Sequence, residues 1–119
     1  MSGGGKRVLL VEDEMLVALD TQEFLSEAGY EVVGPAMSLD EALAMAEGES
    51  LEAAVLDINL AGKLVWPVAE RLVARNVPVV LLSGFGQSLD IPLALRAAPR
   101  LGKPVVGRQL LNELSELVR

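Results

Sequence analysis

The sequence contains neither cysteine nor histidine. The chain therefore has no thiol nucleophile, no disulfide and no Cys/His zinc site, and it has no Ser-His-Asp triad or imidazole acid or base. Any chemistry that it carries out must use carboxylates, hydroxyls, lysine or arginine.

Aromatic residues and positive charge are also scarce. The chain has one Trp, one Tyr and two Phe, and they are scattered, so no base-stacking platform is predicted. The net charge of -7 argues against general binding to a phosphate backbone. We therefore expect no direct contact with nucleic acid.

The N-terminus shows no sign of a targeting or membrane-spanning segment. Residues 1–7 are Gly-rich, and only four apolar residues follow them before Glu12, which is too few for a signal peptide or a membrane span. This predicts a flexible leader over residues 1–5, a cytoplasmic location and no membrane partner.

The remaining composition predicts one globular domain over residues 6–119. With 119 residues, of which 51% are hydrophobic, the chain can bury a single core but not two. Its charge is uneven: residues 1–57 hold 13 acidic and 2 basic side chains (-11), whereas residues 58–119 hold 4 acidic and 8 basic ones (+4). We expect the basic stretch that includes Arg96, Arg100 and Arg108 to contribute to a partner-facing surface.

Short apolar runs alternate with helical patterns along the chain. Continuous rather than alternating apolar residues are typical of strands buried on both faces of a parallel sheet. Right-handed crossovers between such strands give an open, doubly wound α/β domain. The predicted strands are 8–11, 31–33, 53–56, 77–82 and 100–102, and the predicted helices are 17–28, 38–48, 65–75, 89–98 and 110–118.

Two of these helices carry clear end signals. Ser38 and Glu41 form a capping-box pattern at the start of the second helix. The fourth helix is bracketed by Pro92 and Pro99, which leaves room for only about two turns. We expect it to be short and mobile.

Polar side chains follow four of the five predicted strands. Glu12 and Asp13 follow the first, Asp57 the third, Ser83 the fourth and Lys103 the fifth. Each alone is an ordinary loop residue, but the carboxyl ends of parallel strands meet at one edge of the sheet, where ligands bind. Three carboxylates placed together repel by several kcal/mol without a cation, and an all-oxygen acidic cluster suits Mg²⁺ with a phosphate. A carboxylate can then act as nucleophile towards a phosphoryl group.

These motifs resemble the receiver domain of two-component response regulators. The resemblance rests on Glu12-Asp13 after an apolar strand, Asp57 ending Ala54-Val55-Leu56, Ser83-Gly84, and Gly102-Lys103-Pro104. It covers essentially the whole chain from residue 6. It implies a flavodoxin-like (βα)5 fold whose five parallel strands lie in the order 2-1-3-4-5.

The resemblance also implies roles for the residues at the strand ends. Asp57 would be the phosphoacceptor, and Glu12, Asp13 and Asp57 would bind Mg²⁺ together with the backbone carbonyl of Asn59. Because the chain has no histidine, the phosphoryl group would come in trans from a histidine kinase or a histidine phosphotransfer protein.

In the same family, a lysine and a hydroxyl residue respond to the phosphoryl group. Lys103 would pair with phosphorylated Asp57, and Ser83 would move to bond the phosphoryl group. The fourth helix, the fifth strand and the last helix would form the output face.

Three positions depart from the common receiver pattern. Arg100 stands where the family usually has a switch Tyr or Phe, and Leu60-Ala61 replaces the frequent Met-Pro. Ser83-Gly84-Phe85 resembles a subgroup of stand-alone receivers, mostly alphaproteobacterial, that lack the switch aromatic. Phe85 is then either a second signalling residue or a hydrophobic plug.

With no residues left for an output domain, we expect the chain to act by binding a downstream protein or by taking phosphoryl groups from other regulators. A homodimer is also possible. An alternative is a receiver-like adaptor that binds without phosphorylation. A haloacid dehalogenase type phosphatase is disfavoured because Asn59 stands where its second Asp is needed. A flavin-binding function is also disfavoured, because no Ser/Thr-rich phosphate loop follows the first strand.

Overall fold

The computed structural model describes residues 4–84 and 90–118, and these residues build a five-stranded parallel sheet with helices on both faces. The order β2-β1-β3-β6-β7 is the predicted 2-1-3-4-5 arrangement, because β6 and β7 are the fourth and fifth strands of this sheet. The doubly wound flavodoxin-like fold is thus confirmed. The strands are β1 (Arg7–Val11), β2 (Glu31–Ala36), β3 (Ala53–Asp57), β6 (Val79–Ser83) and β7 (Arg100–Gly102).

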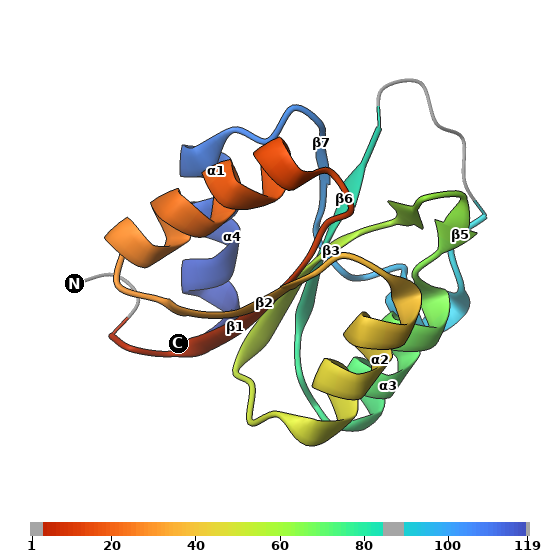
Figure 1. The fold of residues 1–119 in the computed structure, drawn as a ribbon. Coiled ribbons are helices and arrows are strands. Elements are labelled where there is room, and N and C mark those ends of the chain that lie inside the picture. Colours follow the sequence, from red (N-terminus) through yellow and green to blue (C-terminus); the bar gives the residue numbers. More distant parts are fainter. Residues whose placement is uncertain (1–3, 85–89, 119) are drawn as a thin grey trace.

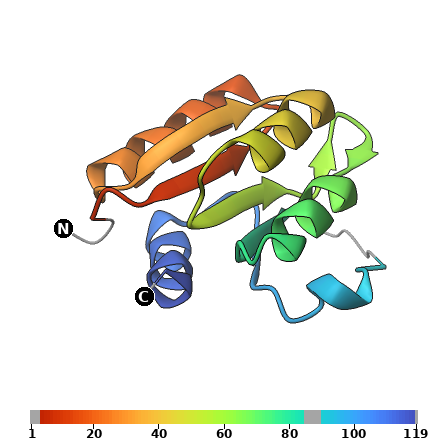
Figure 2. The ribbon, with the colours of Figure 1, turned by 90° about the horizontal axis from the view of Figure 1, so that it is seen from below.

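The helices cover the sheet in two pairs (Figures 1 and 2). One face carries α1 (Met15–Glu27) and α4 (Gly107–Leu117), and the other carries α2 (Leu39–Gly48) and α3 (Trp66–Ala74). No helix among residues 4–84 and 90–118 is long and apolar enough to cross a lipid bilayer.

The core consists of two apolar layers separated by the sheet. Leu9 belongs to the layer under α2 and α3, whereas its neighbour Leu10 belongs to the layer under α1 and α4. Successive residues of a strand point to opposite faces, so a strand covered on both sides needs an unbroken apolar run. Both residues are fully buried. This explains the continuous runs in the sequence. The parallel pairing of β1 with β3, in which Val11 pairs with Leu56, places the carboxyl ends of both strands at the same sheet edge.

Gly34 lets β2 pass close to β1. It has φ +101°, and a Cβ there would lie 2.9 Å from the Leu10 carbonyl oxygen and 2.7 Å from the Ala36 nitrogen. The pairing of β1 with β2 shifts at this point, so that Val11 pairs with Ala36. The Ala36 carbonyl therefore accepts the backbone N–H of Glu12 at 3.0 Å. This hydrogen bond continues the pairing of β1 with β2 to the first acidic residue.

The N-terminus of α2 is capped as predicted, with one difference. Ser38 Oγ accepts the backbone N–H of Glu41 at 3.2 Å. The Glu41 carboxylate accepts the N–H of Met37 at 3.2 Å, one residue before the position that a capping box uses. The side chains of Ser38 and Glu41 thus each accept a backbone N–H, one in the first turn of α2 and one just before the helix.

The fourth helix is short, as predicted, and shorter than the two turns for which its prolines leave room. Within the described residues it is one 3-10 turn, η1 (Leu93–Leu95), and the start of the predicted range lies in residues 85–89, outside the described part. Pro92 is extended, with φ -53° and ψ 144°, so the turn begins only after it. Pro92 and Pro99 restrict any helix here to the few residues between them.

A short hairpin after β3 was not predicted. It consists of β4 (Asn59–Leu60) and β5 (Lys63–Leu64), which pair in antiparallel fashion. It occupies the loop between Asp57 and α3, at the sheet edge where the predicted site residues lie (Figure 1). The strand boundaries also differ slightly: β2 runs on to Ala36, and β6 begins at Val79 and ends at Ser83.

Candidate functional site

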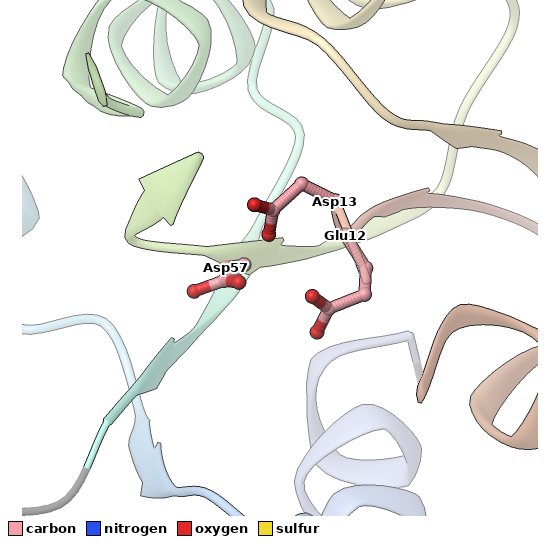
Figure 3. A group of neighbouring side chains, drawn as sticks. All are labelled: Glu12, Asp13 and Asp57. Atoms are coloured by element: carbon pink, nitrogen blue, oxygen red, sulfur yellow. The ribbon is translucent and has the colours of Figure 1, made fainter. Parts of the chain in front are cut away.

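Three carboxylates gather at the carboxyl edge of the sheet. Glu12 and Asp13 follow β1 directly, and Asp57 is the last residue of β3, which pairs with β1. One carboxylate oxygen from each lies within 4.8 Å of those of the others. Figure 3 shows the three side chains turned towards a shared space. The structure thus brings together the three carboxylates that the sequence predicts at this edge.

Glu12 is the most deeply buried of the three, with 1% of its surface exposed. Its Oε2 accepts the backbone N–H of Glu14 at 3.1 Å, while its Oε1 accepts no hydrogen bond within the described residues. A buried carboxylate oxygen without a donor is costly unless a positive charge lies nearby. The Lys103 ammonium supplies such a charge, with Nζ 3.0 Å from Oε1.

Lys103 links the carboxylates of two strands. Its backbone N–H donates to the carbonyl of Ser83 at 2.9 Å, which continues the pairing of β6 with β7 by one residue. Its ammonium donates to Asp57 Oδ2 at 3.0 Å and to Glu12 Oε2 at 3.3 Å, and it lies 3.9 Å from Glu14 Oε1. The lysine is therefore fixed at both its backbone and its charged end.

The electrostatic environment changes the ionisation of Asp57. Burial raises the pKa of Asp57 from 3.8 to about 7; the Lys103 hydrogen bond opposes this rise, and the negative charge of Glu12 adds to it. Burial also works against the charge of Lys103, but the hydrogen bonds to Asp57 and Glu12 outweigh it and raise the pKa of Lys103. One fixed ammonium thus compensates only part of the negative charge that the carboxylates would carry.

A polar cavity of about 260 Å³ opens over these side chains. Asp57 reaches it although only 4% of its surface is exposed. The described lining residues are Asp13, Glu14, Asp57, Asn59, Ala61, Gly84 and Lys103. The nucleophile candidate thus faces a space that a small ligand can enter.

Comparison with known proteins places this geometry in a family. A family model described as the response regulator receiver domain matches residues 8–115. The chain belongs to this family. Receiver domains are signalling modules of two-component systems, which interact with histidine kinases or phosphotransfer proteins and bind Mg²⁺ at an acidic pocket.

The chain matches part of a longer curated protein. The transcriptional regulatory protein PdtaR of Mycobacterium tuberculosis is 34% identical over 83 residues, which are 69% of this chain and 40% of PdtaR. The chain therefore spans less than half the length of this curated relative.

Solved structures of similar length also match. The solution structure of SdrG from Sphingomonas melonis Fr1 has 33% identity and a TM-score of 0.81, covering 100% of this chain and 99% of SdrG. A CheY-like receiver domain protein from Methanospirillum hungatei JF-1 has 28% identity and a TM-score of 0.83, covering 95% and 93%.

The remaining predicted residues of the receiver lie next to the cavity, on the exposed surface away from it, or outside the described part. Ser83 ends β6 half-buried, next to Gly84 of the cavity lining. Arg100 begins β7 and is exposed, as are Arg96 and Arg108, whose contribution to a partner surface stays a prediction. Phe85 falls in residues 85–89, which the structure does not describe.

Two site residues were not found from the sequence. Ala61, at the tip of the β4–β5 hairpin, donates its backbone N–H to Asp13 Oδ2 at 3.0 Å, and Glu14 contributes both a backbone N–H and a nearby carboxylate. A backbone donor carries no side-chain signal, so Ala61 was not identifiable. Glu14 follows two acidic residues directly, and that run of three acids was the available signal.

Asn59 disfavours the phosphatase alternative in the structure as well. Its amide has no acidic proton to give to a leaving group. Its Oδ1 accepts the backbone N–H of Gly62 at 2.8 Å, so the side chain serves the hairpin turn. Its own backbone N–H donates to Asp57 Oδ1 at 3.3 Å.

Proposed function

We propose that this receiver domain accepts a phosphoryl group on Asp57. The observation that carries the proposal is the meeting of Asp57 with Lys103 at a cavity that Asp13 also lines. A carboxylate is a competent nucleophile for phosphoryl transfer when positive charge offsets the charge on the transferring oxygens. Lys103 provides one such charge from a fixed position.

The transfer balances with the groups named. A carboxylate oxygen of Asp57 forms a bond to phosphorus, and the bond from phosphorus to the donor breaks. With a phosphohistidine donor, the imidazole nitrogen keeps the electron pair of the broken P–N bond. With acetyl phosphate, acetate leaves with the pair of the P–O bond. Asp57 must be ionised to attack. Because its pKa is raised, nearby positive charge is needed to favour the ionised form.

The acidic cluster fits a divalent cation, and we propose Mg²⁺. Its donors are all carboxylate oxygens, which is the ligand type that Mg²⁺ prefers. Glu12 Oε1 accepts no hydrogen bond in the described structure and is thus compatible with a further positive charge. Glu12, Asp13 and Asp57 would hold the ion together with the backbone carbonyl of Asn59. The ion would supply charge neutralisation for the phosphoryl oxygens.

The partners follow from the chemistry. The donor would be a histidine kinase or a histidine phosphotransfer protein, since the chain has no histidine to donate from. The reader of the phosphorylated state would be a downstream protein, and transfer between regulators would make the domain a phosphate shuttle. Ser83 and Lys103 would contact the bound phosphoryl group.

Phosphorylation can be tested with the intact chain, Mg²⁺ and acetyl phosphate. We expect the mass to increase by one phosphoryl group and Asp57→Asn to abolish the increase. Asp40→Asn, which changes an exposed carboxylate in the first turn of α2, is the matched control and should phosphorylate normally. An unmodified wild-type chain, or full modification of Asp57→Asn, would contradict the proposal.

A phosphorylation-independent adaptor remains the second candidate because of Arg100. This exposed cation stands on β7 where the family usually has a switch aromatic. Binding of a partner with equal affinity in the presence and absence of beryllofluoride and Mg²⁺ would favour the adaptor. A difference in affinity would favour the phosphoacceptor switch.

A further inference from the structure

The β4–β5 hairpin contacts two of the three clustered carboxylates through its backbone. The N–H of Asn59 donates to Asp57 Oδ1 at 3.3 Å, and the N–H of Ala61 donates to Asp13 Oδ2 at 3.0 Å. Asp57 is already fixed by its place at the end of β3 and by Lys103. Asp13 is different: it lies beyond the end of β1 and is only half-buried, so the hairpin contact matters most for Asp13.

The turn that presents this N–H is an unfavourable one for its sequence. Leu60 pairs with Lys63, so Ala61 and Gly62 form a two-residue loop, and their φ angles are +50° and +90°. Two-residue hairpin loops with both angles positive favour Asn-Gly, whereas alanine seldom adopts a positive φ. Some other contact must therefore hold Ala61 in this conformation.

The Asn59 side chain provides that contact. Its Oδ1 accepts the N–H of Gly62 at 2.8 Å, which closes the turn from within the hairpin. The three contacts form a chain: the Asn59 amide fixes Gly62, the turn fixes the direction of the Ala61 N–H, and that N–H fixes one oxygen of Asp13. One oxygen of Asp13 lies within 4.8 Å of oxygens of Glu12 and Asp57, so the direction of this carboxylate matters to the cluster (Figure 3).

We propose that Asn59 is a positioning residue for the cation site and that its side chain acts on Asp13 through the turn. This inference rests on the proposed Mg²⁺ site, but it adds a role for a side chain whose backbone carbonyl alone was expected to take part. A ligand held in its binding orientation loses less freedom when the ion binds. Loss of the turn contact should therefore weaken cation binding without removing a ligand.

The test is calorimetric titration of Mg²⁺ into the unphosphorylated full chain. Asn59→Ala should weaken binding by roughly three- to tenfold, the scale of one hydrogen bond. Asn112→Ala, which removes the same amide from an exposed position of α4, is the matched control and should bind as the wild type does.

A double-mutant cycle separates an action through Asp13 from an independent one. In an Asp13→Asn background, Asn59→Ala should cost much less affinity than in the wild type, because the residue through which it acts is already changed. An equal loss in both backgrounds, or wild-type affinity of Asn59→Ala alone, would overturn the inference.

Hydrogen exchange of the Ala61 amide in the metal-free protein gives a second readout. Exchange should accelerate in both Asn59→Ala and Asp13→Ala, and it should stay slow in Asn59→Asp, which keeps an acceptor for Gly62. Unchanged exchange in Asn59→Ala would also overturn the inference. If the wild type binds no Mg²⁺, the proposed cation site itself fails; if it binds Mg²⁺ but the Asn59 variant does so equally well, only the positioning role fails.

Discussion

The Nζ atom of Lys103 lies 3.0 Å from Oδ2 of Asp57 and joins the ends of β3 and β7 through one ion pair. The same ammonium also lies 3.0 Å from Glu12 Oε1, so it is shared between two buried carboxylates. Breaking a buried pair costs far more than an exposed one, because the remaining charge has little water around it. The stability of the fold therefore depends on whether protons or cations are bound to the carboxylates at this edge.

The first prediction concerns the pH dependence of stability without Mg²⁺. The folded pKa of Asp57, about 7, exceeds its ordinary value of 3.8, so the folded state binds this proton more tightly than the unfolded state. The resulting contribution is fully present below about pH 4 and is lost as the pH rises towards 7. We expect Asp57→Asn to remove this dependence and to melt several degrees above the wild type at pH 8. Thermal melts followed by circular dichroism from pH 5 to pH 8 would measure it.

The pH prediction has a direct control. Mg²⁺ should raise the melting temperature of the wild type at pH 8 but not that of Asp57→Asn to the same extent, because ligand that binds only the folded state stabilises it. If the melting temperatures of the two proteins changed equally with pH across this range, the assignment of the raised pKa to Asp57 would be contradicted.

The second prediction is the loss of stability on Lys103→Met. Methionine keeps the apolar length of the lysine but leaves the carboxylates of Glu12 and Asp57 without their shared cation. We expect a loss of about 3 kcal/mol at pH 8, and a smaller loss at pH 5, where protonation of Asp57 relieves the repulsion. Urea denaturation at the two pH values would measure both. Lys63→Met, at an exposed lysine of β5, should change little at either pH.

The third prediction separates Ser83 from Arg100 in the response to a phosphoryl mimic. Ser83 ends β6 beside the cavity, whereas Arg100 is exposed at the start of β7. Beryllofluoride with Mg²⁺ should shift backbone amide resonances in β7 and α4. Ser83→Ala should reduce these shifts because it removes a hydroxyl donor, and Arg100→Ala should preserve them. Equal shifts in wild type and Ser83→Ala would show that this hydroxyl takes no part.

Much of the fold could be predicted because the strands are buried on both faces. The apolar run that contains Leu9 and Leu10 serves two layers at once, so its position along the chain is clear from residue type alone. The length of β2 was less clear, since Gly34 and Pro35 normally end a strand. Here Gly34 instead permits the close approach to β1.

The acidic cluster could be predicted for a similar reason, whereas its supports could not. Parallel strands bring their carboxyl ends together, so Glu12, Asp13 and Asp57 had to meet once the strand order was known. The contact from Ala61 to Asp13 depends on a backbone N–H presented by a tertiary arrangement. An Ala-Gly pair gives little hairpin signal, so neither the turn nor its contact could be inferred from residue type.

The fourth prediction tests the conformational cost of Ala61. Asparagine adopts a positive φ more readily than alanine, and Asn-Gly is the favoured pair for this kind of loop. We expect Ala61→Asn to stabilise the metal-free protein by about 1 kcal/mol, seen as a rise of about 4 °C in melting temperature. The same substitution at Ala44, exposed within α2, should instead lower it, since asparagine is a poorer helix former than alanine. A fall in melting temperature for both variants would show that Ala61 is not strained, whereas opposite signs would separate a backbone effect of the turn from a general effect of the new side chain.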